Sequence, residues 1–256
     1  MPDNGRMMVD EHIGALRREG DLLIAAASDI PLETVVPSCP GWTVRDLLRH
    51  LGMVHRWAGS YVAQARTEQR GDDQAPDIGP VPADHDLVAW FRDGHAALVE
   101  TLEAAPTDLS CWTFFAAPTP LAFWARRQAH ETAIHRVDAE LAAKTTPHEC
   151  PASFATDGID ELLCGFFGRP ARVAPVGPPW SLMVVTSETD EAWSIRVSRD
   201  GRVTRRGRSE TKCVLRGSAN DLYLALWNRR STDDLHVDGD RGVLDRWRDH
   251  AAVTWS

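Results

Sequence analysis

Residues 130–138 read HETAIHRVD and lie within a helix that the sequence predicts from Pro120 to about Ala143. Glu131 and His135 are four residues apart, so their side chains lie about 40° apart around a helix and project to the same side. A carboxylate and an imidazole on one helix face are two of the three protein ligands that catalytic metal sites commonly use. The pair therefore predicts part of a metal site.

The first histidine of this segment does not belong to the predicted set. His130 and His135 are five residues apart, about 140° around the helix, so the segment differs from the protease pattern His-Glu-x-x-His, whose histidines are four apart. Asp138 lies three residues after His135 on the same face. It is placed to orient His135 as a hydrogen-bond acceptor, or else to pair with Arg136 or solvent.

The candidate for the third ligand is His50. A helix is predicted to begin after Thr43, a favourable N-cap with Asp46 three residues on, and to run to about Gln69. His50 lies one residue away from the buried stripe of this helix, at the edge of the core, where its ring can reach a neighbouring helix. His55 lies about 140° from His50 and faces elsewhere.

The residue spacing alone leaves several interpretations open. A Glu and a His at i,i+4 are more often a surface pair, and a single His near a core edge is more often hydrogen-bonded than metal-bound. If the site exists, two His and one carboxylate suit zinc with an open position and also non-haem Fe(II). A non-enzymatic bundle that binds a metal, thiol or metabolite, and a purely structural role, remain as alternatives.

The rest of the chain predicts two domains. Apolar spacing predicts a first helix from about Val9 to Ala27, with Arg17, Arg18 and Glu19 facing out, and a third helix after Asp84. Together with the two helices above, these predict an antiparallel four-helix bundle over residues 1–147.

The pattern changes after residue 147. Alternating runs at 181–186 and 193–198, an Asp200-Gly201 turn and a run at 212–215 predict strands, while helices are predicted at 159–167, after Ser218 and at 243–250. Residues 148–256 are therefore expected to form a small α+β domain. The predicted fold class is α+β with two domains.

Composition limits the classes of function. The 256-residue chain has a net charge of −9 at pH 7, which disfavours nucleic acid and anionic membrane surfaces as partners. No apolar run reaches the roughly 20 residues of a membrane span, and the polar start does not resemble a signal peptide. The five cysteines form no Cys-x-x-Cys pair, which is typical of reduced thiols. We therefore expect a cytoplasmic protein.

Two segments together carry a family resemblance. Residues 39–51, CPGWTVRDLLRHL, followed by HETAIHRVD at 130–138, resemble the mycothiol-dependent maleylpyruvate isomerase family of actinobacteria. That resemblance implies a DinB-like metal-binding four-helix bundle followed by a domain similar to sterol-carrier folds. Residues 215–229, LRGSANDLYLALWNR, resemble part of the second domain.

The resemblance implies a ligand set and a chemistry. The family's zinc ligands would be His50, Glu131 and His135, in agreement with the helix geometry. The family also places an arginine of the second domain near the substrate, for which Arg229 and Arg216 are the candidates; each is otherwise a surface charge or an ion-pair partner.

The implied cofactors are Zn²⁺, with Fe(II) or another divalent metal as alternatives, and mycothiol. The implied partners are a low-molecular-weight thiol and a small-molecule substrate, and we expect a monomer or a homodimer. The implied activity is activation of the thiol, either for isomerisation of an activated double bond or for S-transfer to a small electrophile. The alternative is a non-enzymatic sensor that binds a metal, thiol or metabolite.

Overall fold

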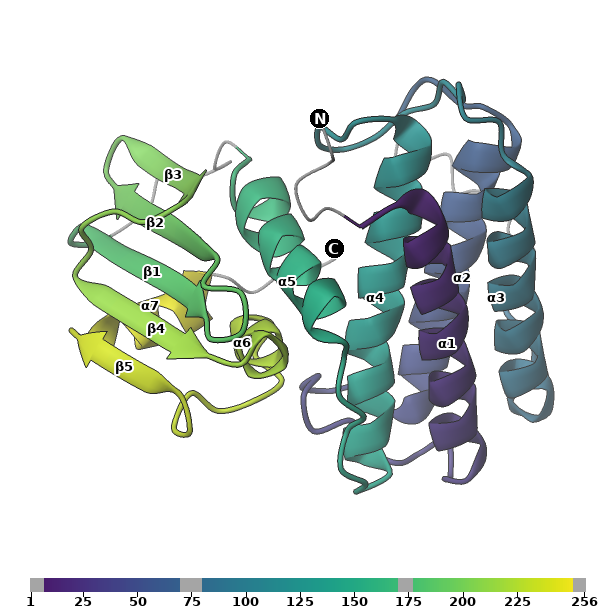
Figure 1. Ribbon diagram of the computed structural model, residues 1–256. Helices are drawn as coiled ribbons and strands as arrows, with labels where there is room; N and C mark the ends of the chain where they lie inside the picture. The colour runs from purple at the N-terminus through teal and green to yellow at the C-terminus, as the bar shows by residue number, and fades with distance from the viewer. Residues whose placement is uncertain (1–6, 70–79, 170–176, 251–256) are drawn as a thin grey trace. The chain divides into compact units, whose positions relative to one another are not determined.

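The structure, a computed structural model, describes residues 7–69, 80–169 and 177–250 (Figure 1). Contacts between Cα atoms divide the described chain into an N-terminal unit, Met7–His148, and a C-terminal unit that begins at Glu149. The first unit is helical and the second contains a five-stranded sheet, so the predicted two-part α+β architecture is confirmed. We keep 1–147 and 148–256 as the proposed domains.

The N-terminal unit contains the four predicted helices. Their bounds are α1 Val9–Ser28, α2 Val44–Ala63, α3 Leu87–Ala104 and α4 Pro120–Ala142. The capping box expected at Thr43 and Asp46 is present at the start of α2. This helix ends earlier than the predicted Gln69, because Ala65 takes a left-handed conformation with φ 45° that a continuing helix excludes.

The bundle consists of two pairs of parallel helices, and the two pairs run in opposite directions. Helices α1 and α4 are parallel. His12 lies beside His130, and further along both helices Glu19 is bonded to Arg136. Helices α2 and α3 also run the same way, because a Cβ atom at Gly52 or Gly59 would meet Trp90 or Leu98, respectively. Across the pairs, α2 runs opposite to α4. This arrangement places the middle of α2 beside the middle of α4.

The core of the bundle lies between these helices. Side chains from α1, α2 and α3 that are exposed by 0% form its centre: Leu23, Val44, Leu47, Leu48, Leu51, Leu87 and Phe91. Burying each of the larger ones contributes about 1.5–3 kcal/mol. The prediction that Glu19 faces out is wrong, because this carboxylate is 1% exposed and bonded to a buried arginine of α4.

The C-terminal unit begins with a helix that starts earlier than the predicted 159–167. Helix α5 spans Ala152–Asp160 and continues as a π-helical segment, Glu161–Phe166. The strands that follow are β1 Trp180–Thr186, β2 Ala192–Ser198, β3 Gly201–Arg206, β4 Cys213–Gly217 and β5 His236–Gly239, with helices α6 Ala219–Leu226 and α7 Gly242–His250. Their order in the sheet is β3-β2-β1-β4-β5, with only β1 and β4 parallel among these strands.

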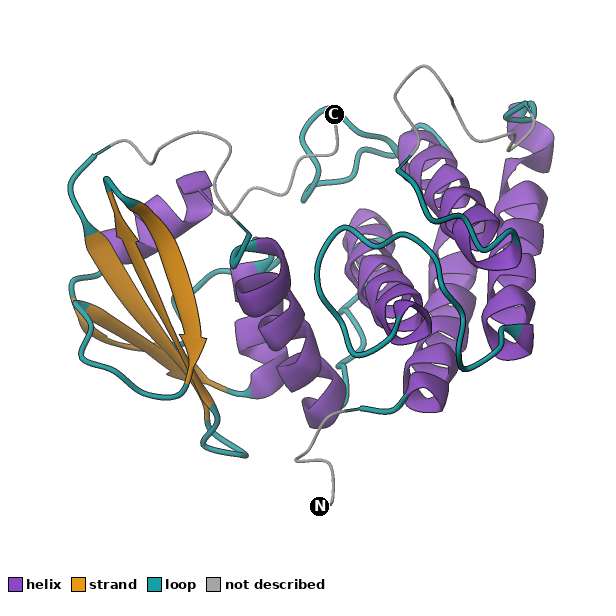
Figure 2. Ribbon diagram, turned by 90° about the horizontal axis from the view of Figure 1, so that it is seen from above, coloured by secondary structure: helices purple, strands orange, loops and turns teal. Residues whose placement is uncertain are grey.

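One face of this sheet is buried. Leu182, Val184, Ile195 and Leu215 lie on it and are at most 1% exposed, and Figure 2 shows the strands with helices of the same unit beside them. Trp193 on β2 donates through Nε1 to Asp160 at the end of α5. The helices and the sheet are therefore joined by polar contacts as well as by apolar packing.

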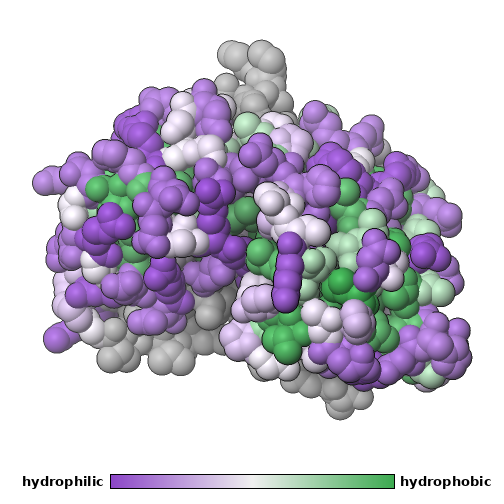
Figure 3. All heavy atoms as spheres, turned by 90° about the horizontal axis from the view of Figure 1, so that it is seen from below, coloured by the Kyte–Doolittle hydropathy of each residue, from purple (hydrophilic) through white to green (hydrophobic). Residues whose placement is uncertain are grey.

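Large hydrophobic side chains are mostly buried in the part of the chain that the structure describes. The face in Figure 3 is mostly hydrophilic, with hydrophobic residues between. Among the described residues, the large hydrophobic side chains that are exposed are Met8, Val35, Met53 and Val203. No helix in the described ranges is both long enough and apolar enough to span a bilayer.

Candidate metal centre

The three predicted ligands lie together in the bundle. His50 comes from the second turn of α2, and Glu131 and His135 come from successive turns of α4. His50 Nε2 is 3.5 Å and His135 Nε2 is 3.4 Å from the same carboxylate oxygen, Glu131 Oε1. His50 Nε2 and Glu131 Oε1 are buried, and neither has a hydrogen-bond partner among the described residues.

These separations fit a metal ion. A tetrahedral site with metal–ligand bonds of about 2.0–2.1 Å places its ligand atoms about 3.3–3.4 Å apart. The imidazole nitrogens of two histidines lie 3.4–3.5 Å from one buried carboxylate oxygen, outside hydrogen-bond geometry, and match that spacing. The donor set therefore suits Zn²⁺ or Fe²⁺ with at least one position left for another ligand.

The other oxygen of Glu131 is held by a buried arginine. Arg127, one turn earlier on α4 and 1% exposed, donates from Nη2 to Glu131 Oε2 at 2.8 Å. This contact turns Oε1 toward the two histidines. Burial raises the pKa of Glu131, but the Arg127 guanidinium and the two imidazoles outweigh that effect and hold the pKa well below its usual range. The carboxyl is therefore ionised and able to bind a cation.

His135 is fixed from its other nitrogen. Its Nδ1 lies 2.9 Å from Asp138 Oδ2, so the neutral ring that carries its proton on Nδ1 presents the Nε2 lone pair to the site. Burial lowers the pKa of His135, but the hydrogen bond to Asp138 and the adjacent Glu131 carboxylate outweigh it and raise the pKa to about 9. Without a cation the second proton stays on the ring at neutral pH.

Trp42 lies against both histidines. Its ring stacks on that of His135, with centroids 6.0 Å apart and an interplanar angle of 16°, and its centroid lies 4.9 Å from that of His50. Trp42 immediately precedes Thr43, the N-cap of α2. The segment that starts this helix thus supplies an apolar wall to the candidate site.

Two further histidines occupy the core beside the site. His55 and His95 are buried with ring centroids 5.3 Å apart, and His55 Nε2 lies 2.9 Å from Thr132 Oγ1. Burial, and then the neighbouring His95, lower the pKa of His55 well below 6.5. His55 is therefore neutral at pH 7, and its contacts with Thr132 and His95 agree with the prediction that it faces away from the ligand set.

We expect acid to destabilise the fold through His55. The pKa of His55 is lower in the folded state than in the unfolded state. Its contribution to folding stability is therefore fully present above pH 6.5 and is lost as the pH falls below 6.5. Between pH 6.5 and 5.5 this costs about 1 kcal/mol. The raised pKa of His135 has the opposite effect, because acidification then increases stability, but this gain falls above pH 6.5. Urea unfolding of chelator-treated protein at the two pH values should therefore show that the free energy of unfolding falls less in His55→Gln than in wild type.

The matched control is His85→Gln, which removes an exposed histidine beside Asp86. This variant should lose as much stability on acidification as wild type. An equal loss in His55→Gln and wild type would contradict a depressed pKa for His55.

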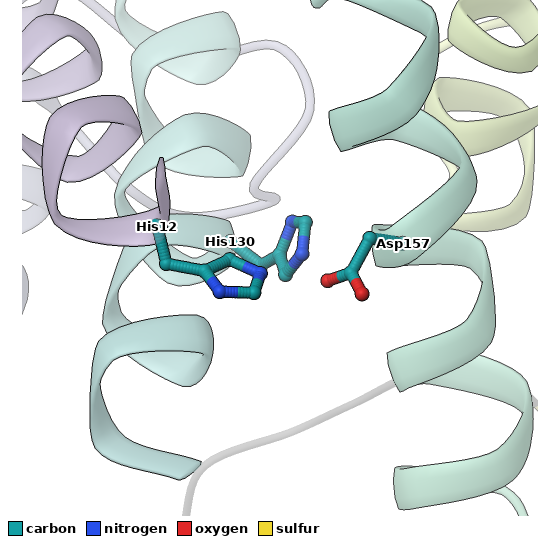
Figure 4. Close-up of side chains that lie close together, drawn as sticks. All are labelled: His12, His130 and Asp157. Atoms are coloured by element: carbon teal, nitrogen blue, oxygen red, sulfur yellow. The ribbon is translucent and has the colours of Figure 1, made fainter. Parts of the chain in front are cut away.

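His130 points away from the ligand set, as its angular position on the helix predicts. Figure 4 shows its ring beside that of His12 from α1, with centroids 6.0 Å apart and an interplanar angle of 73°. The third side chain labelled there, Asp157, belongs to the C-terminal unit. His12 and His130 therefore belong to the α1/α4 interface of the bundle.

The two candidate arginines lie in different parts of the C-terminal unit. Arg216 follows Leu215 on β4 and so lies on the face of the sheet opposite the buried one, where its Nη1 is 3.4 Å from Asp190 Oδ1. Arg229 follows α6 and donates from Nη1 to the carbonyl of Trp227. Their roles near a substrate stay predictions.

Sequence reasoning missed several partners of the ligands. The i,i+4 spacing of Arg127 and Glu131 was a usable signal, because it places the two groups on one face. Cys39 and Trp42 lie in the segment 39–51 that carries the family resemblance, but no residue spacing predicted their contacts or that of Ser38. They reach the site from the loop before α2, with Ser38 and Cys39 both bonded to Asp138, 100 and 99 residues further along the chain.

Comparisons with known proteins identify the fold and the family. The chain is similar to two crystal structures, of the mycothiol-dependent maleylpyruvate isomerase and of a histidine-to-alanine mutant of it. Each is 14% identical with a TM-score of 0.64, and each comparison covers 91% of this chain and 95% of the other. No curated protein matches significantly. At this identity the two structures show a shared fold.

Family models identify both halves of the chain. The model of the mycothiol maleylpyruvate isomerase N-terminal domain matches residues 13–140, and that of the family's C-terminal domain matches residues 153–246. The first match contains all three candidate ligands, and the second contains both candidate arginines. The chain therefore belongs to the mycothiol maleylpyruvate isomerase family.

Proposed function

We propose that this protein is a metal-dependent enzyme that activates a low-molecular-weight thiol, with mycothiol as the thiol and Zn²⁺ as the metal. Its reaction is isomerisation of an activated carbon–carbon double bond, as in the maleylpyruvate isomerase that shares its fold, or S-transfer to a small electrophile. The observation that carries the proposal is the approach of His50 Nε2 and His135 Nε2 to Glu131 Oε1 in a buried position.

The residues around this point have distinct tasks. His50, Glu131 and His135 would hold the cation. Asp138 selects the imidazole tautomer of His135 that offers Nε2, and Arg127 keeps Glu131 ionised with Oε1 turned inward. A divalent cation in such a site supplies positive charge that lowers the pKa of a thiol entering the open position.

The two reactions share their first half. The thiol sulfur adds to an electrophilic carbon, and a proton is lost from the thiol. In the isomerase, rotation about the resulting single bond and loss of the same thiol regenerate the double bond in the other geometry. In the transferase, the sulfur stays on the product. The candidate centre supports both, because it contributes only to the activation of the thiol.

The decisive experiment combines metal analysis with thiol chemistry. Wild-type protein should bind one equivalent of zinc and consume mycothiol with an electrophile or isomerise maleylpyruvate in its presence, whereas His50→Ala should do neither. His85→Ala removes an exposed histidine and is the matched control. Equal rates in wild type and His50→Ala would remove the proposed catalytic role of the centre.

Two alternatives predict different results. One equivalent of iron in protein purified without added metal, together with oxygen-dependent turnover, would favour Fe(II) chemistry on the same ligands. Tight thiol binding without turnover of any electrophile would favour the non-enzymatic sensor.

A further inference from the structure

The buried carboxylate of Asp138 joins two distant parts of the bundle. Its Oδ2 accepts from His135 Nδ1 at 2.9 Å and from Cys39 Sγ at 3.3 Å, and its Oδ1 accepts from the hydroxyl of Ser38. His135 lies on the same helix, whereas Ser38 and Cys39 are 100 and 99 residues away. One side chain thus contacts both a candidate metal ligand and a loop before α2.

The loop that carries these donors is a small hairpin, residues 35–43. Val35 and Thr43 form an isolated antiparallel bridge, and the backbone N–H of Val36 donates to the carbonyl of Trp42 at 2.9 Å. Trp42 stacks on His135, so the hairpin contacts the ring of this ligand directly and also through Asp138. The hairpin and the candidate ligand are therefore connected twice.

The donors from the hairpin are needed for an electrostatic reason. Asp138 is 0% exposed, and a buried carboxylate is costly unless hydrogen-bond donors replace its water. The ring of His135 supplies one donor, and the hairpin supplies two. If the hairpin moved away, the Asp138 carboxylate would lose two hydrogen-bond donors and would orient the ring of His135 less firmly.

We propose that Asp138 is a positioning residue that couples the 35–43 hairpin to the metal site, so that cation binding at His135 and docking of the hairpin stabilise each other. This inference rests on the proposed function only in that His135 holds a cation. Ser38 acts one step further out, by fixing the Asp138 carboxylate. By linkage, a hairpin held in place raises metal affinity, and bound metal holds the hairpin in place.

The first test measures zinc affinity by competition with a chromophoric chelator. Asp138→Asn keeps the size of the side chain and removes its charge, and zinc affinity should fall by about 10–100-fold. Ser38→Ala should lose about tenfold, at the low end of that range. Ser38→Thr keeps the hydroxyl and should restore affinity. The control is Ser28→Ala, whose hydroxyl bonds only to the carbonyl of Ile24 among the described contacts.

The second test measures the coupling itself. Amide hydrogen exchange of peptides that contain residues 35–43 should slow when zinc is added to wild type, because opening of the hairpin then costs the metal-binding free energy as well. In Asp138→Asn at saturating zinc, the same peptides should gain less protection. Peptides from α3 serve as the internal reference.

The outcomes separate this inference from the proposed function. Wild-type affinity in both Asp138→Asn and Ser38→Ala, or equal zinc-induced protection of the hairpin in wild type and Asp138→Asn, would overturn the coupling and leave the metal site standing. Absence of zinc binding in wild type would overturn both. If Asp138→Asn does not fold, the Ser38→Ala and Ser38→Thr pair decides the question, since threonine keeps the hydroxyl that alanine removes.

Discussion

Replacing Glu131 by glutamine is expected to lower zinc affinity by more than about 100-fold, the upper end of the loss that follows removal of an outer hydrogen-bond partner of a ligand. The reason is that Oε1 is the atom shared by both histidine contacts, and a neutral amide is a poor ligand. Addition of zinc should raise the melting temperature of wild type but not that of Glu131→Gln, because only a bound ion stabilises the folded state. Calorimetry of both proteins with and without zinc measures this.

A surface carboxylate provides the matched control for Glu131. Glu103 pairs with Arg17 as Glu131 pairs with Arg127, but this surface pair has side chains exposed by 48% and 51%, respectively. Glu103→Gln should keep full zinc affinity and the same zinc-induced rise in melting temperature. A comparable rise in Glu131→Gln would show that Glu131 is no ligand.

Replacing Arg136 by methionine is expected to cost about 3–5 kcal/mol of stability, the typical effect of removing one partner of a buried ion pair. The Arg136 guanidinium is fully buried and donates to Glu19 on α1 at 2.8 Å and to Glu140 on α4 at 2.6 Å. It also donates to the carbonyl of His148. Without it, two buried carboxylates lose their main positive partner. Urea denaturation of metal-free protein measures the loss.

Two variants test this explanation. Arg17→Met removes an exposed arginine from its pair with Glu103 and should cost no more than about 1 kcal/mol. Glu140→Gln leaves Arg136 paired with Glu19, and provides a milder change if Arg136→Met does not fold. A loss of less than about 1 kcal/mol in the free energy of unfolding of Arg136→Met would show that Arg136 does not stabilise the buried carboxylates of Glu19 and Glu140.

The sequence was sufficient for much of the architecture because local signals were strong. The N-cap at Thr43 and the apolar spacing of the first four helices predict the bundle, and the i,i+4 spacing of Glu131 and His135 predicts a shared face. The structure places His50 against that face. That these three residues bind a metal stays a prediction.

What the sequence did not reveal depends on pairing at long range. Periodicity assigns charged residues to solvent, yet Glu19 and Arg136 are buried because each neutralises the other. The contact of Ser38 with Asp138 spans 100 residues and leaves no local pattern. The strand β5 was missed because it is short and mostly exposed, so it lacks the alternation that marks a strand.

The parallel pairing of α1 with α4 has a consequence for how the chain reaches its native state. Glu19 and Arg136 are separated by 117 residues, so α1 cannot bury its acidic side chain until α4 has been synthesised. At about 5–20 residues per second on the ribosome, that interval is roughly 6–23 seconds. During this time Glu19 lacks the buried arginine that neutralises it, whereas the apolar residues of α1 can already pack against those of α2 and α3.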